Sequence, residues 1–543
     1  MKKRTYFAAL LPFLILAGMF EILPVFTIIV KSFMPESGDP GFTLQNYINI
    51  FSKPLYLTAI KNSLIISVVS AVIGLAVAFV GGRAACEKGG RPKRIFMSVL
   101  NMVSNFSGVP LAFSFIILLG NAGVITILGR NLGIDAIADF PLYTVWGLML
   151  TYVYFQIPLA TLLLIPSFDS IRNEWKEAVS LMGGNSAVFW RRVGIPVLMP
   201  SILGTFSTLF ANAVSAYATA YALLMNNFSI LPVRISEQFT GDVVQRPQFG
   251  SALAVVLMLM MTLSILITQS LTQKRGGGKN EKSKRGSGVI LGVIGIYLMI
   301  PLLFTFIYSM FSEWMDVMPT GFTLRAYAEI FSDGAFWMSI GRTIVISILP
   351  IILCTLAVLL AMYVVVVYCP WLDKYMKILC TMPYAIQGVI LPISVLALYA
   401  DAPEPFSNRI FMLTSTYCIV VLPYVYQGIR NNLNGMNASR LIEAAQMLGA
   451  GRFYAFFHIV VPNIISGVMV SAMLAMAIVF GDFVVINTMA GNYFPTAQMY
   501  LYDVMKKSSQ RTCAIIIVLF CVTLLISGFV FLRGKGGDEK AHE

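Results

Sequence analysis

Long apolar runs separated by short polar stretches dominate this sequence. Six runs precede a basic, glycine-rich stretch at 273–288 and six follow it, each long enough to cross about 30 Å of hydrocarbon. They lie near residues 6–30, 62–82, 95–119, 142–166, 195–224, 249–272, 288–311, 341–368, 377–400, 410–430, 459–489 and 511–532. The pattern predicts an all-α, polytopic membrane protein with about twelve transmembrane helices. The first run has no small-residue cleavage site, so we expect a retained helix rather than a signal peptide.

The composition agrees with a membrane location. Hydrophobic residues make up 58% of the chain and charged residues 12%, whereas soluble domains carry about 25% charge. A net charge of +13 could suggest a nucleic-acid partner, but 26 of the 38 Lys and Arg residues fall in segments that share one side of the predicted bundle. Because cytoplasmic loops collect such residues, we expect no nucleic acid, a plasma membrane location, and both chain ends in the cytoplasm.

Two sequence segments occur twice. Residues 41–47 (GFTLQNY) recur at 321–327 (GFTLRAY) with an offset of 280, and 177–183 (EAVSLMG) recur at 443–449 (EAAQMLG) with an offset of 266. The shorter offset assigns about 14 extra residues to the first half, most simply between Gly120 and Phe140. An even number of helices precedes the repeat, so the halves share one orientation and a translocation path is expected between them.

This repeat divides the chain into four parts. We expect a first six-helix half at 1–272, a basic cytoplasmic linker at 273–288, a second six-helix half at 289–533 and a polar tail at 534–543. The linker composition is that of a flexible connection.

Residues for catalysis are scarce. The seven cysteines form no CxxC pair, and His458 and His542 are the only histidines. The chain therefore offers few residues that could form a metal centre or a hydrolytic triad. No GxxxxGK[ST] phosphate-binding loop is present. We therefore expect no enzyme and no cofactor in this chain, and ATP-driven transport would need a separate ATPase that binds ATP and Mg²⁺.

The twice-used Glu-Ala segment carries a family resemblance. Each copy ends in a Gly, which is followed by nine residues and then by a hydrophobic-x-hydrophobic-Pro stretch that ends at Pro196 or Pro462. This resembles the EAA signature of binding-protein-dependent ABC importer permeases, with conservative departures at Val179, Val193, Ile195 and Val461. Ser170 or Ser439 could serve each short helix as an N-cap region, which would place the acidic residues early in the helix.

The resemblance implies a bacterial permease whose MetI-like halves are fused, as in iron(III), thiamine, aminoethylphosphonate and polyamine permeases. It implies two partners, a cytoplasmic ABC ATPase homodimer and an extracytoplasmic solute-binding protein. By carry-over, the implied ATPase-contact residues are Glu177, Ala178, Gly183, Glu443, Ala444, Ala445 and Gly449.

Polar residues inside the predicted spans are candidates for the translocation path, because lipid penalises them unless they face a cavity or a partner. Asp482 aligns with Ala216, so its carboxylate occurs in one half only. It could line the path and attract a cation, pair with an Arg, or cap a broken helix. Weaker path candidates are Asn212, Tyr217 and Asn487, with Tyr221, Gln387 and Tyr424 as interhelical hydrogen-bonding groups.

Two further features concern the helix ends. Glu21 lies in the first span beside Pro24, and the pairing of Pro24 with Pro301 suggests a kink shared by both halves. The segments 231–238 and 494–500 follow the fifth span of each half and suit an outer gate or a plain connector.

Two alternative functions compete with the importer permease. A secondary transporter can also combine two parallel six-helix halves, but it needs ion-coupling acids, and Asp482 and Glu21 are among the few available. A membrane-embedded enzyme is disfavoured by the lack of catalytic clusters. The sequence leaves the solute open, with Asp482 favouring a cation such as iron(III), thiamine or a polyamine.

Overall fold

The computed structural model describes residues 2–36, 41–104, 106–168, 171–224, 228–240, 245–271, 287–313, 319–386 and 388–539. Most of the expected linker at 273–288 lies outside these residues. In the described part, eleven helical stretches are long and apolar enough to cross a membrane, or twelve if one bent pair is counted as a span. The prediction of an all-α membrane protein with about twelve spans is therefore confirmed.

The spans of the first half keep the predicted order. The first combines α1 (Lys2–Ala17), the π-helical turn η1 (Gly18–Ile22) and α2 (Leu23–Ser32). The others are built from α4 (Pro54–Lys88), α5 (Gly90–Ser104), α6 (Val109–Leu119), α9 (Val145–Phe168), α12 (Ile195–Ser215), α13 (Ala218–Leu224) and α15 (Pro247–Leu271). Helices α7 (Val124–Leu132) and α8 (Asp135–Ala138) occupy the segment to which the extra residues were assigned.

The second half repeats this order. Its spans are built from α16 (Ser287–Tyr308), α18 (Gly334–Val367), α19 (Asp373–Thr381), the 3₁₀ turn η5 (Met382–Ile386), α20 (Ile390–Tyr399), α21 (Arg409–Gly435), α24 (Val461–Phe480), α25 (Val484–Met489) and α27 (Ser509–Glu539). The expectation of one continuous helix at 377–400 was wrong, because the α19 and α20 parts bend by 100°. The predicted helix at 95–119 is likewise divided into α5 and α6.

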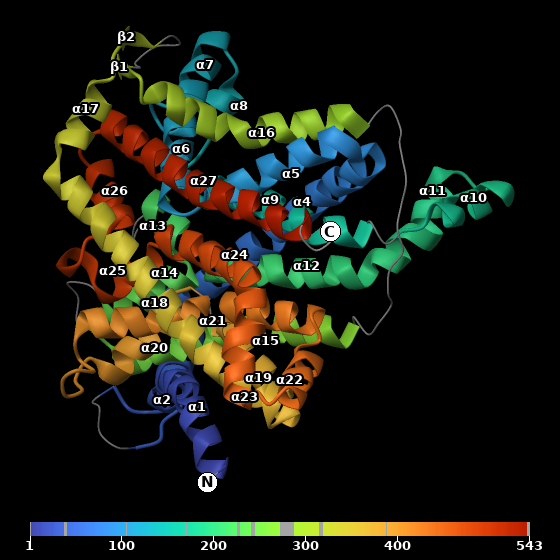
Figure 1. Ribbon diagram of the computed structural model, residues 1–543. Coiled ribbons are helices and arrows are strands. Elements are labelled where there is room, and N and C mark those ends of the chain that lie inside the picture. The colour runs from blue at the N-terminus through green and yellow to red at the C-terminus, as the bar shows by residue number, and fades with distance from the viewer. Residues whose placement is uncertain are drawn as a thin grey trace.

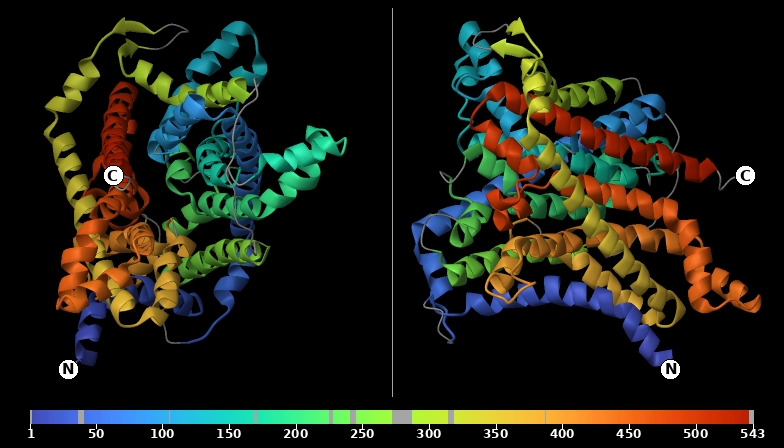
Figure 2. Two further views of the ribbon diagram at one scale, coloured as in Figure 1. Left: turned by 45° about the vertical axis from the view of Figure 1, so that its right-hand side comes forward. Right: turned by 60° about the vertical axis from the view of Figure 1, so that its left-hand side comes forward.

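Short elements cover the two ends of the bundle (Figure 2). At one end, here called the hairpin face, lie α3 (Gln45–Ser52), α17 (Arg325–Ser332) and the antiparallel strands β1 (Phe311–Glu313) and β2 (Thr320–Phe322). The opposite end, here called the tip face, carries α10 (Asn173–Leu181), α11 (Ser186–Phe189), α22 (Ala438–Met447) and α23 (Arg452–Ala455). In the right-hand view the tip face is on the right, together with the start of α1 and the end of α27.

The first span of each half packs on the other half. In Figure 1, α1 and α2 lie at the bottom beside α18 and α20, whereas α16 lies at the top beside α4, α5 and α6. Hydrogen bonds reinforce this exchange in both directions. Tyr399 OH donates to the Met19 carbonyl over 2.8 Å, and Tyr154 OH donates to the Leu298 carbonyl. The two halves are therefore interlocked rather than simply placed side by side.

Three π-helical turns precede prolines. These turns are η1, η2 (Trp190–Gly194) and η6 (Phe456–Val460), and the prolines Pro24, Pro196 and Pro462 follow two residues later. Proline removes a backbone donor, so the helix must rearrange locally. Helix α16 runs through Pro301 without such a turn, so the two prolines differ in local helix type, and a kink shared by Pro24 and Pro301 stays a prediction.

Candidate functional site: a central cavity and two exposed helices

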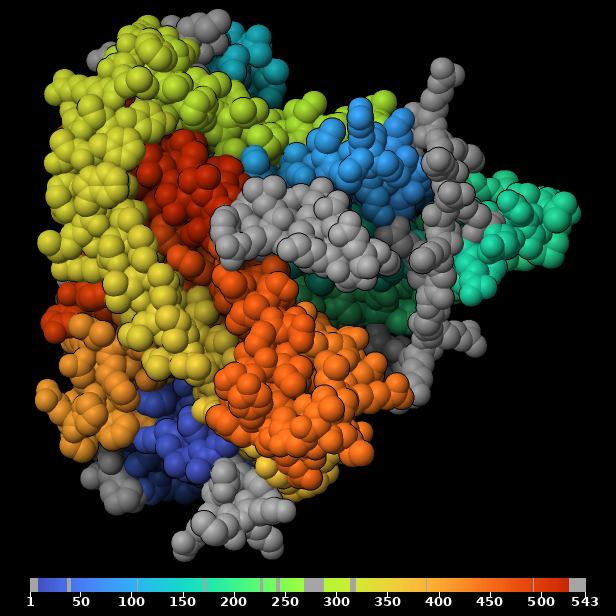
Figure 3. Space-filling view, in the orientation of Figure 1, coloured from blue at the N-terminus to red at the C-terminus, as the bar shows by residue number. Residues whose placement is uncertain are grey.

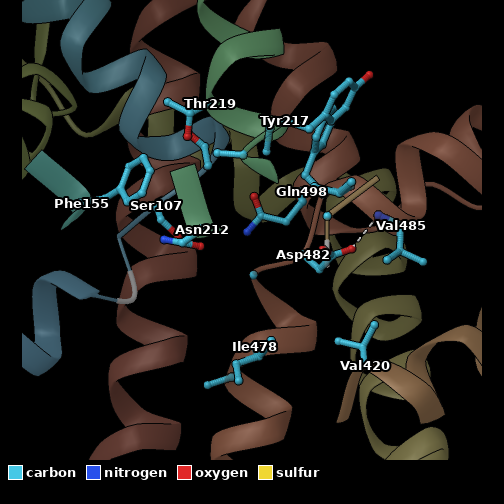
Figure 4. Close-up of a pocket in the computed structure, with 18 of the residues that line it drawn as sticks. Ser107, Phe155, Asn212, Tyr217, Thr219, Val420, Ile478, Asp482, Val485 and Gln498 are labelled. Atoms are coloured by element: carbon cyan, nitrogen blue, oxygen red, sulfur yellow. Dashed lines mark hydrogen bonds between the residues drawn. The ribbon is translucent and has the colours of Figure 1, made fainter. Parts of the chain in front are cut away.

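Four interruptions of membrane spans meet at one cavity between the halves. Its volume is about 390 Å³, and its lining includes Gly108, Ala216, Gly388 and Asp482. Each of these residues lies where one helix stops and the next begins, between α5 and α6, α12 and α13, η5 and α20, and α24 and α25. Irregular backbone at membrane depth is tolerated where it lines a cavity. The breaks therefore mark the polar interior of the molecule, here called the central cavity (Figure 4).

Glycine makes two of these breaks possible. Gly108 and Gly388 have φ values of 72° and 73°, in the left-handed region that costs other residues roughly 1–2 kcal/mol. They are separated by 280 residues, the same offset as the repeated segment at 41–47. Both halves therefore break the equivalent span at a glycine. Each glycine turns the chain into the half-helix that enters the cavity wall.

Two equivalent tyrosines support the breaks in the fifth spans. Tyr152 on α9 donates to the Ala216 carbonyl over 2.7 Å, and Tyr417 on α21 donates to Asp482 Oδ2 over 2.9 Å. Asp482 Oδ2 also accepts from the backbone amide of Val485 over 2.9 Å. Of the three roles open to Asp482, it therefore caps the broken helix at α25, and it also lines the central cavity.

The weaker path candidates separate into two groups. Asn212 and Tyr217 line the central cavity, as does Tyr424. Asn487 is not among the lining residues; its side-chain amide donates to Tyr217 OH over 3.0 Å and joins the two halves. Gln387 lies outside the described residues. Glu21 is buried away from the lining, and no described residue is hydrogen-bonded to its carboxylate.

An aromatic cluster adjoins the cavity. Tyr217 stacks on Tyr221 with 5.0 Å between ring centroids, and Tyr221 stacks on Tyr502 of the other half at 5.6 Å. The ring centroid of Phe483 lies 5.2 Å from that of Tyr502. These four rings come from both halves, so they hold the broken fifth spans together.

Sequence reasoning missed Gln498. It lies on α26 (Ala497–Met505), within the segment interpreted as an outer gate or connector, and it lines the central cavity. The Ala497 amide donates to Thr343 Oγ1 over 2.8 Å, and Tyr500 OH donates to Asp333 Oδ2 over 2.5 Å. The Tyr500 hydroxyl and the Ala335 amide lower the pKa of Asp333. A polar residue just after Pro495 was the available signal, but only the fold shows that it faces inward.

The EAA-type segments form two exposed helices, α10 and α22. Gly183 and Gly449 follow them with φ values of 75° and 88°, a backbone conformation that favours glycine and lets the chain turn back toward the membrane. Next to each glycine, the Gly184 amide donates to the Val179 carbonyl and the Ala450 amide donates to the Ala445 carbonyl. These bonds are typical of a helix end closed by glycine.

Apolar side chains project from the end of each helix. Leu181 and Met182 are 89% and 78% exposed, and Met447 and Leu448 are 89% and 90% exposed. These two pairs, here called the apolar tips, are separated by 266 residues. Figure 3 shows α10 and α11 standing out from the bundle.

The remaining signature residues divide by burial. Glu177, Ala178, Glu443 and Ala444 are exposed. Ala445 is 5% exposed, so it packs against its own chain rather than facing a partner, as does Val179 at the equivalent position. The N-caps are Arg172 and Asn437; Ser439 therefore lies inside α22, and Ser170 lies outside the described residues. Glu177 and Glu443 sit in the middle of their helices, so the expected early position was wrong.

Metal ligands do not gather in the described part of the chain, where no three His, Cys, Asp or Glu side chains could hold a metal ion.

Comparison with known proteins finds a family match in the second half of the chain. Residues 354–534 match the family described as the inner membrane component of binding-protein-dependent transport systems. The second half of the chain therefore carries the domain of this family.

Individual relatives are distant. The chain is 24% identical over 383 residues to the probable ABC transporter permease protein y4fN of Sinorhizobium fredii, covering 66% of each protein. It is 20% identical over 439 residues to the thiamine transport system permease protein ThiP of Salmonella typhimurium, covering 76% of this chain and 77% of the relative. A bacterial ABC transporter that imports alginate aligns with a TM-score of 0.40 and 15% identity, over 49% of this chain and 94% of that chain.

Proposed function

We propose that the chain forms the translocation pathway of an ATP-driven importer in a bacterial inner membrane. In this proposal α10 and α22 dock on two copies of a separate cytoplasmic ATPase. A solute-binding protein then delivers the solute at the hairpin face, which lies outside the membrane. The family description, which names dependence on a binding protein, supports the external partner.

The apolar tips are the observation that carries this proposal. Four large apolar side chains, each at least 78% exposed, cost free energy in water unless another surface covers them. Their position at the ends of twin helices favours two equivalent pockets. A homodimeric ATPase offers such a pair, because its subunits are identical.

Sidedness supports the same arrangement. Arg172, Lys176, Arg191 and Arg192 surround the first tip, and Arg440 and Arg452 flank the second. Basic residues next to spans favour the cytoplasmic side. The tip face would then be cytoplasmic, together with both chain ends, and the hairpin face external.

The helices offer a direct mechanical route from the tips to the cavity. After Gly183 the chain continues through α11 and η2 into α12, which ends at Ser215 beside the break at Ala216. In the second half, α23, η6 and α24 lead to Gly481 and Asp482. Closing of the ATPase dimer would move the two tips together, rock these helices and open the central cavity to alternate sides.

Charged substitutions at the tips test the proposal. Because a carboxylate resists burial in an apolar pocket, Leu181→Glu and Leu448→Glu should each weaken retention of the ATPase about tenfold or more, and the double variant should abolish it. The measurement is co-purification of the ATPase with the tagged chain from detergent-solubilised membranes, together with ATP-dependent uptake in vesicles.

A matched control lies at the other end of the molecule. Leu132 on α7 is 68% exposed, and Leu132→Glu should leave ATPase retention unchanged. Full retention and uptake in the double tip variant would refute the docking of α10 and α22. Uptake that follows an ion gradient without ATP would instead favour a secondary transporter.

A further inference from the structure

The central cavity has a single formally charged group among its described lining residues, Asp482. Its other polar side chains are amides and hydroxyls, from Ser104, Ser107, Asn212, Ser215, Tyr217, Thr219, Tyr384, Tyr424, Gln498 and Thr523. Neither Lys nor Arg lines the described wall. A desolvated anion needs cationic or multiple N–H partners, so this wall does not suit an anionic solute.

Gln498 adds an unused acceptor. Its side chain is 4% exposed, and its Oε1 atom has no hydrogen-bond partner among the described residues. Figure 4 shows Gln498 between Asn212 and Asp482. A buried acceptor without a donor is unfavourable, so a solute that donates a hydrogen bond at this position would gain affinity.

The chain on both sides of the acceptor is held in place. The residue before Gln498 is fixed by its bond to Thr343, and Tyr500 two residues later is fixed by Asp333. Phe106 and Phe155 line the same cavity, and aromatic faces attract organic cations. An unpartnered amide oxygen, a carboxylate and aromatic walls together suit an organic ammonium group.

We propose that the central cavity recognises a small organic cation that donates N–H hydrogen bonds to Gln498 Oε1 and is attracted by Asp482. This inference rests on the proposed function, because it assigns the chemistry of the solute that passes through the same cavity. Asn212 and Thr219 from the first half also line this cavity.

Three probes of one length test the charge preference. We expect 1,4-diaminobutane to bind the full-length chain in lipid nanodiscs more tightly than the neutral 1,4-butanediol, and succinate not to bind, as measured by isothermal titration calorimetry. Thiamine, a larger organic cation, should also bind. Binding of neither cation, or tighter binding of succinate, would overturn the proposal.

Substitutions at the acceptor test the site. Gln498→Leu should weaken binding of the cation roughly tenfold, because a hydrogen bond to a charged donor is lost, whereas Gln498→Glu should tighten it. Gln510→Leu is the control, because Gln510 is half-buried, donates to the Ser312 carbonyl and lies outside the lining. Equal affinities in the wild type and Gln498→Leu would contradict the assignment even if Asp482→Asn proved unstable.

The two proposals can fail separately. If the ATPase is retained by the wild type and lost in the tip variants while the cavity binds succinate, the solute class is wrong and the importer stands. If cations bind but no ATPase is retained, the importer is wrong.

Discussion

Two glycines at equivalent breaks differ in what surrounds them. A Cβ atom built on Gly388 would lie 2.6 Å from the Ser215 carbonyl oxygen, whereas one on Gly108 would meet nothing closer than 3.6 Å. Both positions have positive φ, so any substitution carries a backbone cost of roughly 1–2 kcal/mol. Only Gly388 adds a clash with backbone from the other half.

This difference predicts unequal effects of the same substitution. Gly388→Ala should lower the melting temperature of the detergent-solubilised chain clearly more than Gly108→Ala, because the Ser215 backbone cannot move without disturbing the adjacent break. Thermal unfolding monitored by circular dichroism measures both. Equal shifts in melting temperature for the two variants would show that the end of α12 can move away from the new Cβ atom without a cost in stability.

At the residue scale, sequence reasoning found Asp482 but not its partners. An acid in an apolar run is visible in the sequence, because lipid penalises it. The contacts with Tyr417 and the Val485 amide depend on where α24 ends, and no local signal fixed that point. Gln498 was overlooked because a glutamine near a chain turn is usually exposed.

At the scale of single elements, the two glycines after α10 and α22 offer a clean test of the turn. Gly449→Val should cost roughly 1–2 kcal/mol because of its positive φ, although open space surrounds it. The altered turn should displace Met447 and Leu448, so uptake and ATPase coupling should fall while membrane insertion remains normal. Uptake assays alongside quantified membrane levels provide the measurement.

Gly435 provides the matched control. It ends α21 on the same face, has open space around it and has no positive φ, so Gly435→Val should retain uptake. Wild-type uptake by Gly449→Val would mean that the turn does not position the tip.

Glu443→Lys, which reverses an exposed charge on α22, should impair coupling in the same assay.

Hydropathy predicted where elements are but not where they break. The apolar runs continue through Gly108 and Gly388, so the sequence indicated single straight spans there. Hydropathy is blind to a bend, because both half-helices remain apolar. The twin exposed helices were easier to predict, since a repeated motif in polar loops marked them independently of packing.

For the whole molecule, the sequence repeat predicted two equivalent halves but not their interlocking. A repeat shows which segments correspond, whereas tertiary packing decides on which half a helix lies. Phe20 of the first half illustrates the exchange. Its ring centroid lies 5.3 Å from that of Tyr399 and 5.7 Å from that of Phe411, both in the second half.

A divided chain tests this packing. Residues 1–279 and 280–543, co-expressed as two polypeptides, should co-purify. Phe20→Ala should weaken their association, because truncating a buried Phe costs about 3 kcal/mol. The measurement is the amount of the second fragment that stays bound to the first as the detergent concentration is raised.

Phe26→Ala is the control in the same span, because Phe26 is 60% exposed and faces lipid rather than the other half. If Phe20→Ala and Phe26→Ala reduce retention equally, the first span does not hold the halves together.

Placing both halves on one polypeptide also removes a constraint on charge. A permease assembled from two identical subunits would set every acid of its cavity opposite a copy of itself, and two carboxylates at close range repel each other and compete for protons. Here the position equivalent to Asp482 in the other half is Ala216, and both residues line the central cavity. Covalent linkage thus permits a path with an intrinsic polarity across its axis, so that a passing solute meets one charged wall and one neutral wall.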